Sequence, residues 1–170
     1  VAEAIGYANR CYANDMLGEQ DRAVADCTRS LELVPDDAEV INNRAVAYLN
    51  KGLLDEAEED LDRAIELRPD YAAAYANRGR MWLEREDFER ALEDLDQAIE
   101  LDPGLAQAYA NRGSAKDNLG RKEEALADFD RAIELNPQYA WAIAKRGDTC
   151  YRLERWEEAL ADFDRAVELN

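Results

Sequence analysis

The sequence predicts an all-α fold built from five copies of one helix-turn-helix unit, giving ten antiparallel helices. All four prolines are spaced 34 residues apart: Pro35, Pro69, Pro103 and Pro137. The segments before them read SLELVP, AIELRP, AIELDP and AIELNP, and the hexapeptide AYANRG occurs at 74–79 and again at 108–113. Self-similarity at one fixed period of this length is the signature of a stacked repeat protein.

The 34-residue period divides the chain into consecutive units whose positions can be numbered in the same way. With each proline at position 32, every unit begins with an alanine, and one domain, 1–170, contains five units: 4–37, 38–71, 72–105, 106–139 and 140–170. We expect helices at positions 1–14 and 18–31 of each unit, because apolar residues recur there at helical spacing. Acidic residues open the second helix, where they suit the helix dipole, and proline ends it.

Small residues recur where the two helices of a unit approach each other. Alanine stands at position 20 in all five units, and position 8 is small in units two to five: Ala45, Gly79, Gly113 and Gly147. Each unit is therefore predicted to be a closely packed antiparallel hairpin.

This pattern resembles the tetratricopeptide repeat family, which has the same 34-residue period. The family places alanine at positions 20 and 27, a large apolar residue at position 24 and proline at position 32, and nearly the whole chain follows that pattern. The resemblance implies a right-handed α-solenoid in which the first helix of each unit lines a concave inner wall. It also implies a protein-binding scaffold without catalytic activity. Because the shared motif consists of packing residues, it does not identify the partner.

Arginine stands at position 7 of every unit, where the family usually has leucine: Arg10, Arg44, Arg78, Arg112 and Arg146. A partly buried guanidinium group needs a partner. Aspartate recurs at position 23 in all five units and at position 25 in four, opposite position 7 across the hairpin. We expect an Arg–Asp bridge between the two helices of every unit.

Asparagine occupies position 6 of the first four units, and Lys145 replaces it in the fifth: Asn9, Asn43, Asn77 and Asn111. Asparagine inside a helix costs roughly 0.5 kcal/mol relative to alanine, so four copies need a reason. The resemblance puts position 6 on the concave wall, where a similar asparagine ladder in the family holds the backbone of an extended peptide. Two alternatives stay open: inheritance by duplication of the unit, or a bond to the neighbouring helix.

Five further residues are candidates for contact with a peptide on the same wall: Arg80, Leu49, Leu83, Trp141 and Tyr151. With the asparagine row, they favour a scaffold that binds another protein or peptide in extended form. The alternative is a structural module that self-associates head to tail, because the last unit leaves Leu160, Phe163 and Val167 without a following helix. Val1 and Asn170 also stand in phase, which suggests a piece excised from a longer array.

Composition argues against several other functions. The net charge of -18 lacks the basic surface that nucleic acid requires, and no apolar run is long enough to span a membrane. There is no histidine, which excludes Ser-His-Asp and Cys-His centres and the commonest zinc sites, so we expect no enzyme, no cofactor and no metal unless a catalytic domain lies elsewhere. Cys11, Cys27 and Cys150 match no metal or redox motif and are expected to be core thiols of a cytoplasmic protein.

Overall fold

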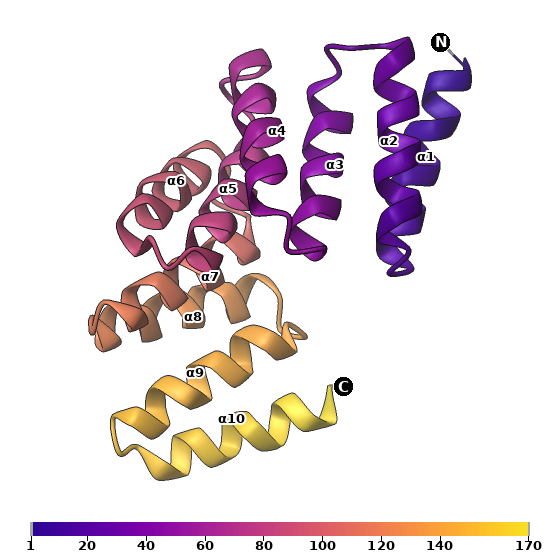
Figure 1. The fold of residues 1–170 in the computed structure, drawn as a ribbon. Helices are drawn as coiled ribbons and strands as arrows, with labels where there is room; N and C mark the ends of the chain where they lie inside the picture. The colour runs from indigo at the N-terminus through magenta and orange to yellow at the C-terminus, as the bar shows by residue number, and fades with distance from the viewer. Residues whose placement is uncertain (1, 170) are drawn as a thin grey trace. The chain divides into compact units, whose positions relative to one another are not determined.

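The computed structural model describes residues 2–169, which form ten helices and no strand (Figure 1). The all-α prediction is confirmed. Val1 and Asn170, whose matching phase is noted above, lie outside the described residues. The helices are α1 (Ala2–Met16), α2 (Gln20–Leu33), α3 (Ala38–Asn50), α4 (Leu54–Leu67), α5 (Ala72–Glu84), α6 (Phe88–Leu101), α7 (Ala106–Asn118), α8 (Lys122–Leu135), α9 (Ala140–Arg152) and α10 (Trp156–Glu168).

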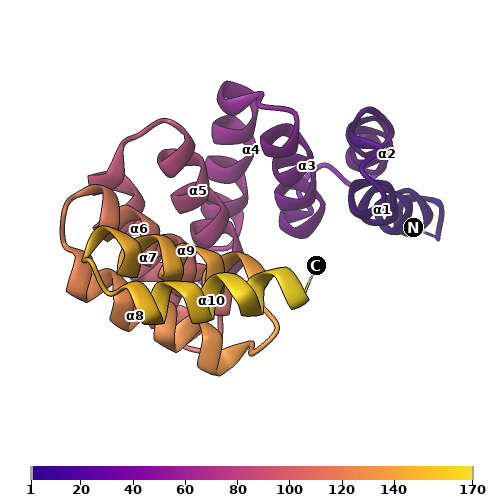
Figure 2. The same ribbon diagram turned by 90° about the horizontal axis from the view of Figure 1, so that it is seen from below.

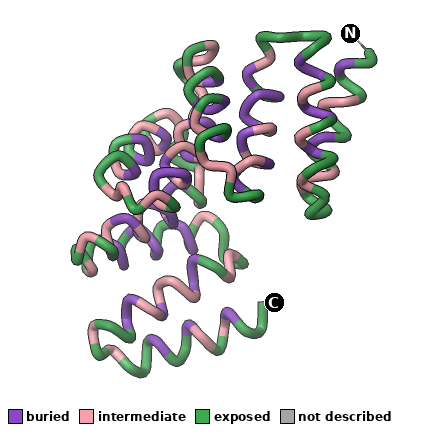
Figure 3. The backbone as a smooth tube through the Cα atoms, in the orientation of Figure 1, coloured by how far each residue is buried: buried purple, intermediate pink, exposed green. Residues whose placement is uncertain are grey.

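The chain divides into two compact halves, residues 1–81 and residues 82–170, with the boundary inside α5. Within the N-terminal half, α1 packs against α2, α2 against α3, and α3 against α4. Within the C-terminal half, α6 to α10 pack in the same sequential order. Figure 2 shows the close pairing of α1 with α2 and of α9 with α10, and Figure 3 shows buried residues recurring along the length of every helix. Within each half, the helices in these pairs therefore bury residues against their neighbours in the sequence.

The turn inside each repeat requires a backbone in the left-handed conformation, with a positive φ angle, at position 15. Glycine supplies it in three repeats, with φ angles between 74° and 79°, and glutamate takes the same conformation with φ of 60° in the other two: Gly18, Gly52, Gly120, Glu86 and Glu154. A residue with a Cβ atom pays about 1 kcal/mol to adopt this conformation. The turns of repeats three and five are therefore more strained than the others.

The two helices of a repeat meet at positions 8 and 24, where side-chain sizes are complementary. A Cβ atom added to Gly113 would lie 2.9 Å from the ring of Phe129, and one added to Gly147 would lie 2.9 Å from the ring of Phe163. In repeat two, where position 8 is the larger Ala45, position 24 holds Leu61, which is smaller than phenylalanine. The small residues predicted from the repeat therefore leave the space that the opposite side chain fills.

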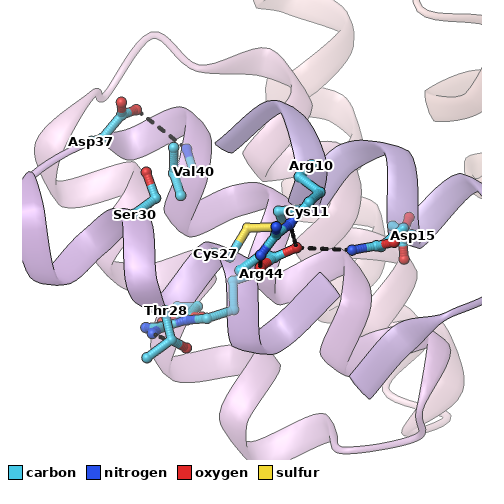
Figure 4. Close-up of a disulfide and its surroundings, with 12 residues drawn as sticks. Arg10, Cys11, Asp15, Cys27, Thr28, Ser30, Asp37, Val40 and Arg44 are labelled. Atoms are coloured by element: carbon cyan, nitrogen blue, oxygen red, sulfur yellow. Dashed lines mark hydrogen bonds and ion pairs between the residues drawn. A yellow bond between two sulfur atoms is a disulfide. The ribbon is translucent and has the colours of Figure 1, made fainter. Parts of the chain in front are cut away.

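The first repeat uses a covalent bond at this same pair of positions. Cys11 on α1 and Cys27 on α2 are joined by a disulfide, and both residues are fully buried (Figure 4). The prediction that all three cysteines are thiols is therefore wrong for these two, while Cys150 is a free, buried thiol. The bonded pair has a sequence separation of 16, but the hairpin brings positions 8 and 24 into contact. No helix among residues 2–169 has the length and apolar character that crossing a membrane requires.

Candidate peptide-binding surface

The predicted Arg–Asp bridge is confirmed in repeats one, two, four and five. In each of them the arginine at position 7 donates through Nε and Nη2 to the two carboxylate oxygens of the aspartate at position 23. In repeat two, for example, both donor–acceptor distances between Arg44 and Asp60 are 2.7 Å. This forked geometry is the strongest form of the Arg–carboxylate hydrogen bond. The four pairs are Arg10–Asp26, Arg44–Asp60, Arg112–Asp128 and Arg146–Asp162.

The residue at position 25 has a different role from the predicted one. It accepts from Nη1 of the arginine in the following repeat and not from the arginine of its own hairpin. The distances are 2.6 Å for Arg78–Asp62, 2.7 Å for Arg112–Asp96 and 2.7 Å for Arg146–Asp130, and Thr28 accepts from Arg44 at 3.2 Å. One guanidinium group therefore holds its own hairpin together and also ties it to the hairpin before.

These bridges fix the charge of the groups that form them. Burial alone would lower the pKa of Arg112, but hydrogen bonds to Asp128 and Asp96 raise it above its ordinary value. Hydrogen bonding from Arg10 lowers the pKa of Asp26, and Asn14 donates a third bond to the same carboxylate at 2.9 Å. Because their donors are used within and between hairpins, Arg44, Arg112 and Arg146 are structural residues and do not offer a binding site.

Asn77 supports the structural interpretation of the asparagine row. Its Nδ2 donates to Oδ1 of Asn42 on α3 at 2.9 Å, so the amide joins two consecutive repeats. Asn42 stands at position 5 and is 5% exposed, and sequence reasoning overlooked it. The available signal was that position 5 is alanine in every other repeat: Ala8, Ala76, Ala110 and Ala144.

Asn111 does not present its side chain to a ligand either. It is 5% exposed, and its Nδ2 has no hydrogen-bond acceptor among the described residues. At position 5 of the preceding repeat stands Ala76, which has no side-chain acceptor. Asn111 is therefore a buried copy of the repeated residue, and its contact with a peptide stays a prediction.

Asn9 and Asn43 differ from both of these residues. Asn9 is exposed and Asn43 is half-buried, and neither side chain forms a hydrogen bond within residues 2–169. Both line a hollow of about 710 Å³ between α1 and α3. Its apolar walls come from Ile5, Tyr12, Val34 and Val40. Two free carboxamides thus stand at the edge of an apolar hollow in the N-terminal half.

Leu49, which is predicted to contact a peptide, is only 2% exposed. It continues the i, i+4 series of Ile41 and Ala45, both of them buried, so the helix turns it into the core. Arg80 is partly accessible and its Nη2 donates to Oδ1 of Asn50 at 3.0 Å. Leu83 is half-buried.

The two aromatic candidates of the C-terminal half are accessible. The side chain of Trp141 is 40% exposed and its ring lies near Lys145, whose Nζ is 5.8 Å from the ring centroid. Tyr151 is 57% exposed and meets the edge of Trp156, with 5.1 Å between ring centroids. These contacts leave part of each ring free, but the one asparagine of the row in this half, Asn111, is buried.

Solved structures with the same fold include several repeat proteins. A thermophilic TPR protein of Thermus thermophilus is 22% identical, with a TM-score of 0.89 over 98% of this chain and 91% of that one. PilF of Pseudomonas aeruginosa is 19% identical, with a TM-score of 0.86 over 99% and 77% of the two chains. MamA is 24% identical, with a TM-score of 0.72 over 92% of each chain. At these identities the likeness establishes the fold, an α-solenoid of helical hairpins.

Family comparison agrees with this architecture. A search of curated proteins gives no match to the sequence. Three family models described as tetratricopeptide repeat match residues 17–72, 42–106, 78–148 and 140–170. Together they cover far more than half of the sequence, and the period of 34 residues and the position 20 alanines agree with them. The chain therefore belongs to the tetratricopeptide repeat family.

Proposed function

We propose that this chain binds an extended segment of a partner protein through Asn9 and Asn43, on the faces of α1 and α3 that line the hollow. Tetratricopeptide repeat proteins are in general non-catalytic scaffolds for protein interaction. The observation that carries the proposal is the contrast within the asparagine row. The amides of Asn9 and Asn43 have no partner within residues 2–169, whereas Asn77 is bonded to Asn42 and Asn111 is buried.

The chemistry of a free carboxamide suits recognition of a peptide backbone. It presents one acceptor and two donor hydrogens, so it can bond both the N–H and the C=O of a peptide unit without reading the side chain. Packed helices lie about 8–10 Å apart, and an extended chain advances about 3.3 Å per residue. Two asparagines on first helices of consecutive repeats would therefore hold peptide units about three residues apart.

The test is a screen of the wild-type chain on an unbiased array of extended peptides, beside the double variant Asn9→Ala, Asn43→Ala. We expect the double variant to lose binding at least tenfold. The matched control is Asn77→Ala, whose amide is already engaged, and it should bind as the wild type does. Circular dichroism establishes that all three proteins are equally helical. Retained binding in the double variant would reject the proposal.

Self-association is the second candidate function. It is favoured by exposed apolar side chains on α10 and, among the described residues, by an unpaired carboxylate on α10 and an unused guanidinium N–H on α1. Leu126 and Ile133 on α8 are each 7% exposed because α9 covers them, whereas the corresponding Leu160 and Val167 on α10 are 62% and 76% exposed. Asp164 stands at position 25 of this repeat and forms no ion pair within the described residues.

The complementary group is on α1. Arg10 uses Nε and Nη2 for Asp26, while within residues 2–169 its Nη1 forms none of the bonds to a neighbouring repeat that Arg44, Arg112 and Arg146 make. An α10 face of one copy could therefore meet the α1 face of another through Arg10 and Asp164. Sedimentation should show association that Asp164→Arg abolishes. A wild-type chain that remains monomeric at high concentration would eliminate this candidate.

A further inference from the structure

We infer that the hollow between α1 and α3 selects a peptide segment in which an aliphatic side chain lies next to a lysine or arginine. This inference rests on the proposed function and adds the chemical class of the ligand to it. Three properties of the hollow carry it: its apolar lining, its acidic rim, and a helix N-terminus that is already occupied.

The lining can bury an aliphatic side chain. Ile5, Tyr12 and Val34 are between 38% and 58% exposed and surround the opening, while Val40 is buried beneath them. The volume of about 710 Å³ is within the range of pockets that bind small ligands, and it accommodates a side chain together with part of its backbone. Contact with three exposed apolar side chains would remove water from both surfaces.

The rim of the hollow is acidic. Asp37 and Glu39 line it, and none of the described residues that line it is a lysine or an arginine. Glu39 is exposed and forms no ion pair within residues 2–169. A cation beside the aliphatic residue would meet these two carboxylates, while an acidic residue would be repelled.

The N-terminus of α3 is closed to anions. Asp37 caps this helix, because its Oδ1 accepts from the backbone N–H of Glu39 at 3.1 Å. The same oxygen accepts from the backbone N–H of Val40 at 3.2 Å (Figure 4). These are the groups that would otherwise attract a carboxylate or phosphate. The hollow therefore does not suit a C-terminal carboxylate or a phosphorylated side chain.

The walls of the hollow are held in place before a ligand arrives. The Cys11–Cys27 disulfide fixes α1 to α2, and the hydroxyl of Ser30 donates to the carbonyl of Ala4 at 2.9 Å. Serine stands at position 27 only in this repeat, where the other four have alanine. A wall that is already ordered loses less conformational entropy on binding.

The experiment measures fluorescence anisotropy with labelled, acetylated and amidated decapeptides of one polar host sequence. Their central pair is Leu-Lys, Ala-Lys or Leu-Glu. We expect the Leu-Lys peptide to bind at least tenfold more tightly than either of the others. Glu39→Lys, at an exposed position, should remove the preference for lysine over glutamate. Ala8→Phe, which places a ring in the hollow, should remove the preference for leucine over alanine.

The outcomes distinguish a failure of the side-chain selection from a failure of the proposed peptide-binding function. If all three peptides bind equally and Asn9→Ala, Asn43→Ala abolishes that binding, the peptide-binding function stands and the selection is rejected. If no peptide binds to a wild-type chain of normal helicity, both are rejected. Self-association that Ala8→Phe abolishes would assign the hollow to a second copy of the chain and would likewise overturn the inference.

Discussion

Replacing Arg146 with leucine, the residue usual at this position in the family, tests whether the Arg–Asp bridge holds a repeat together. Arg146 donates to both oxygens of Asp162, at 2.8 and 2.6 Å, and to Asp130 at 2.7 Å. The side chain of Asp162 is only 7% exposed, and Arg146 is its only partner among the described residues. The substitution therefore leaves a carboxylate buried without compensation.

The expected loss follows from these contacts. Removing one partner of a buried ion pair costs about 3–5 kcal/mol, because the remaining charge stays desolvated. The bond to Asp130, which is 56% exposed, adds up to about 1 kcal/mol. Burial of the leucine side chain returns about 1–2 kcal/mol. We expect Arg146→Leu to lower the free energy of unfolding by about 3 kcal/mol.

The assay is urea denaturation followed by circular dichroism, with the urea dependence of the unfolding free energy compared between variants. Arg131→Ala is the matched control, because Arg131 and its partner Glu134 are both about half-exposed, and it should cost less than about 1 kcal/mol. The double variant Arg146→Leu, Asp162→Ala should recover most of the loss, since no unpaired charge remains. A single variant within about 0.5 kcal/mol of the wild type, or a double variant as unstable as the single one, would refute the reasoning.

Three further predictions concern the hairpins. Replacing Cys11 and Cys27 with alanine should cost about 3 kcal/mol in urea denaturation, because the disulfide closes a loop of about 15 residues, and addition of dithiothreitol to the wild type should have a similar effect. Asp26→Asn should lower stability at pH 7 and flatten its acid dependence: the hydrogen bond from Arg10 lowers the pKa of Asp26, so its contribution is present above about pH 4 and is lost as the pH falls through the lowered value. A pH series of thermal melts of both proteins checks this, and parallel curves would contradict it. Gly113→Ala should cost about 1–3 kcal/mol through overpacking against Phe129, and Phe129→Leu in the same chain should rescue it, since an alanine–leucine pair occupies these positions in repeat two.

The fold could be predicted because the repeat constrains every element five times. A single helix with the apolar spacing of Leu92, Leu95 and Ala98 would be ambiguous, but the same spacing at a fixed distance from each proline is not. The Arg–Asp bridge was predictable for a related reason. A charged residue that recurs at one position needs a recurring partner, and positions 23 and 25 supplied one opposite position 7 across the hairpin.

The contact residues were harder to predict, because they depend on differences between repeats. Leu49 was assigned to the inner wall by its position in the family pattern, but its own helix places it in line with Ile41 and Ala45. The disulfide was missed because an odd number of cysteines favoured free thiols. The informative comparison was between positions 8 and 24, which hold Cys11 and Cys27 in the one repeat that departs from the small–large rule.

The asparagine row shows how one repeated residue acquires three different environments. The side chain at position 6 is identical in four repeats, so its availability must depend on what surrounds it. The side-chain amide of Asn77 is bonded to Asn42, and Asn111 is buried. For Asn43, the residue at position 5 of the preceding repeat is Ala8, which offers no side-chain acceptor. Among the described residues, only the first two repeats therefore combine free amides with an apolar hollow. Duplication explains why asparagine recurs, but the residues that differ between repeats determine which copies can contact a partner.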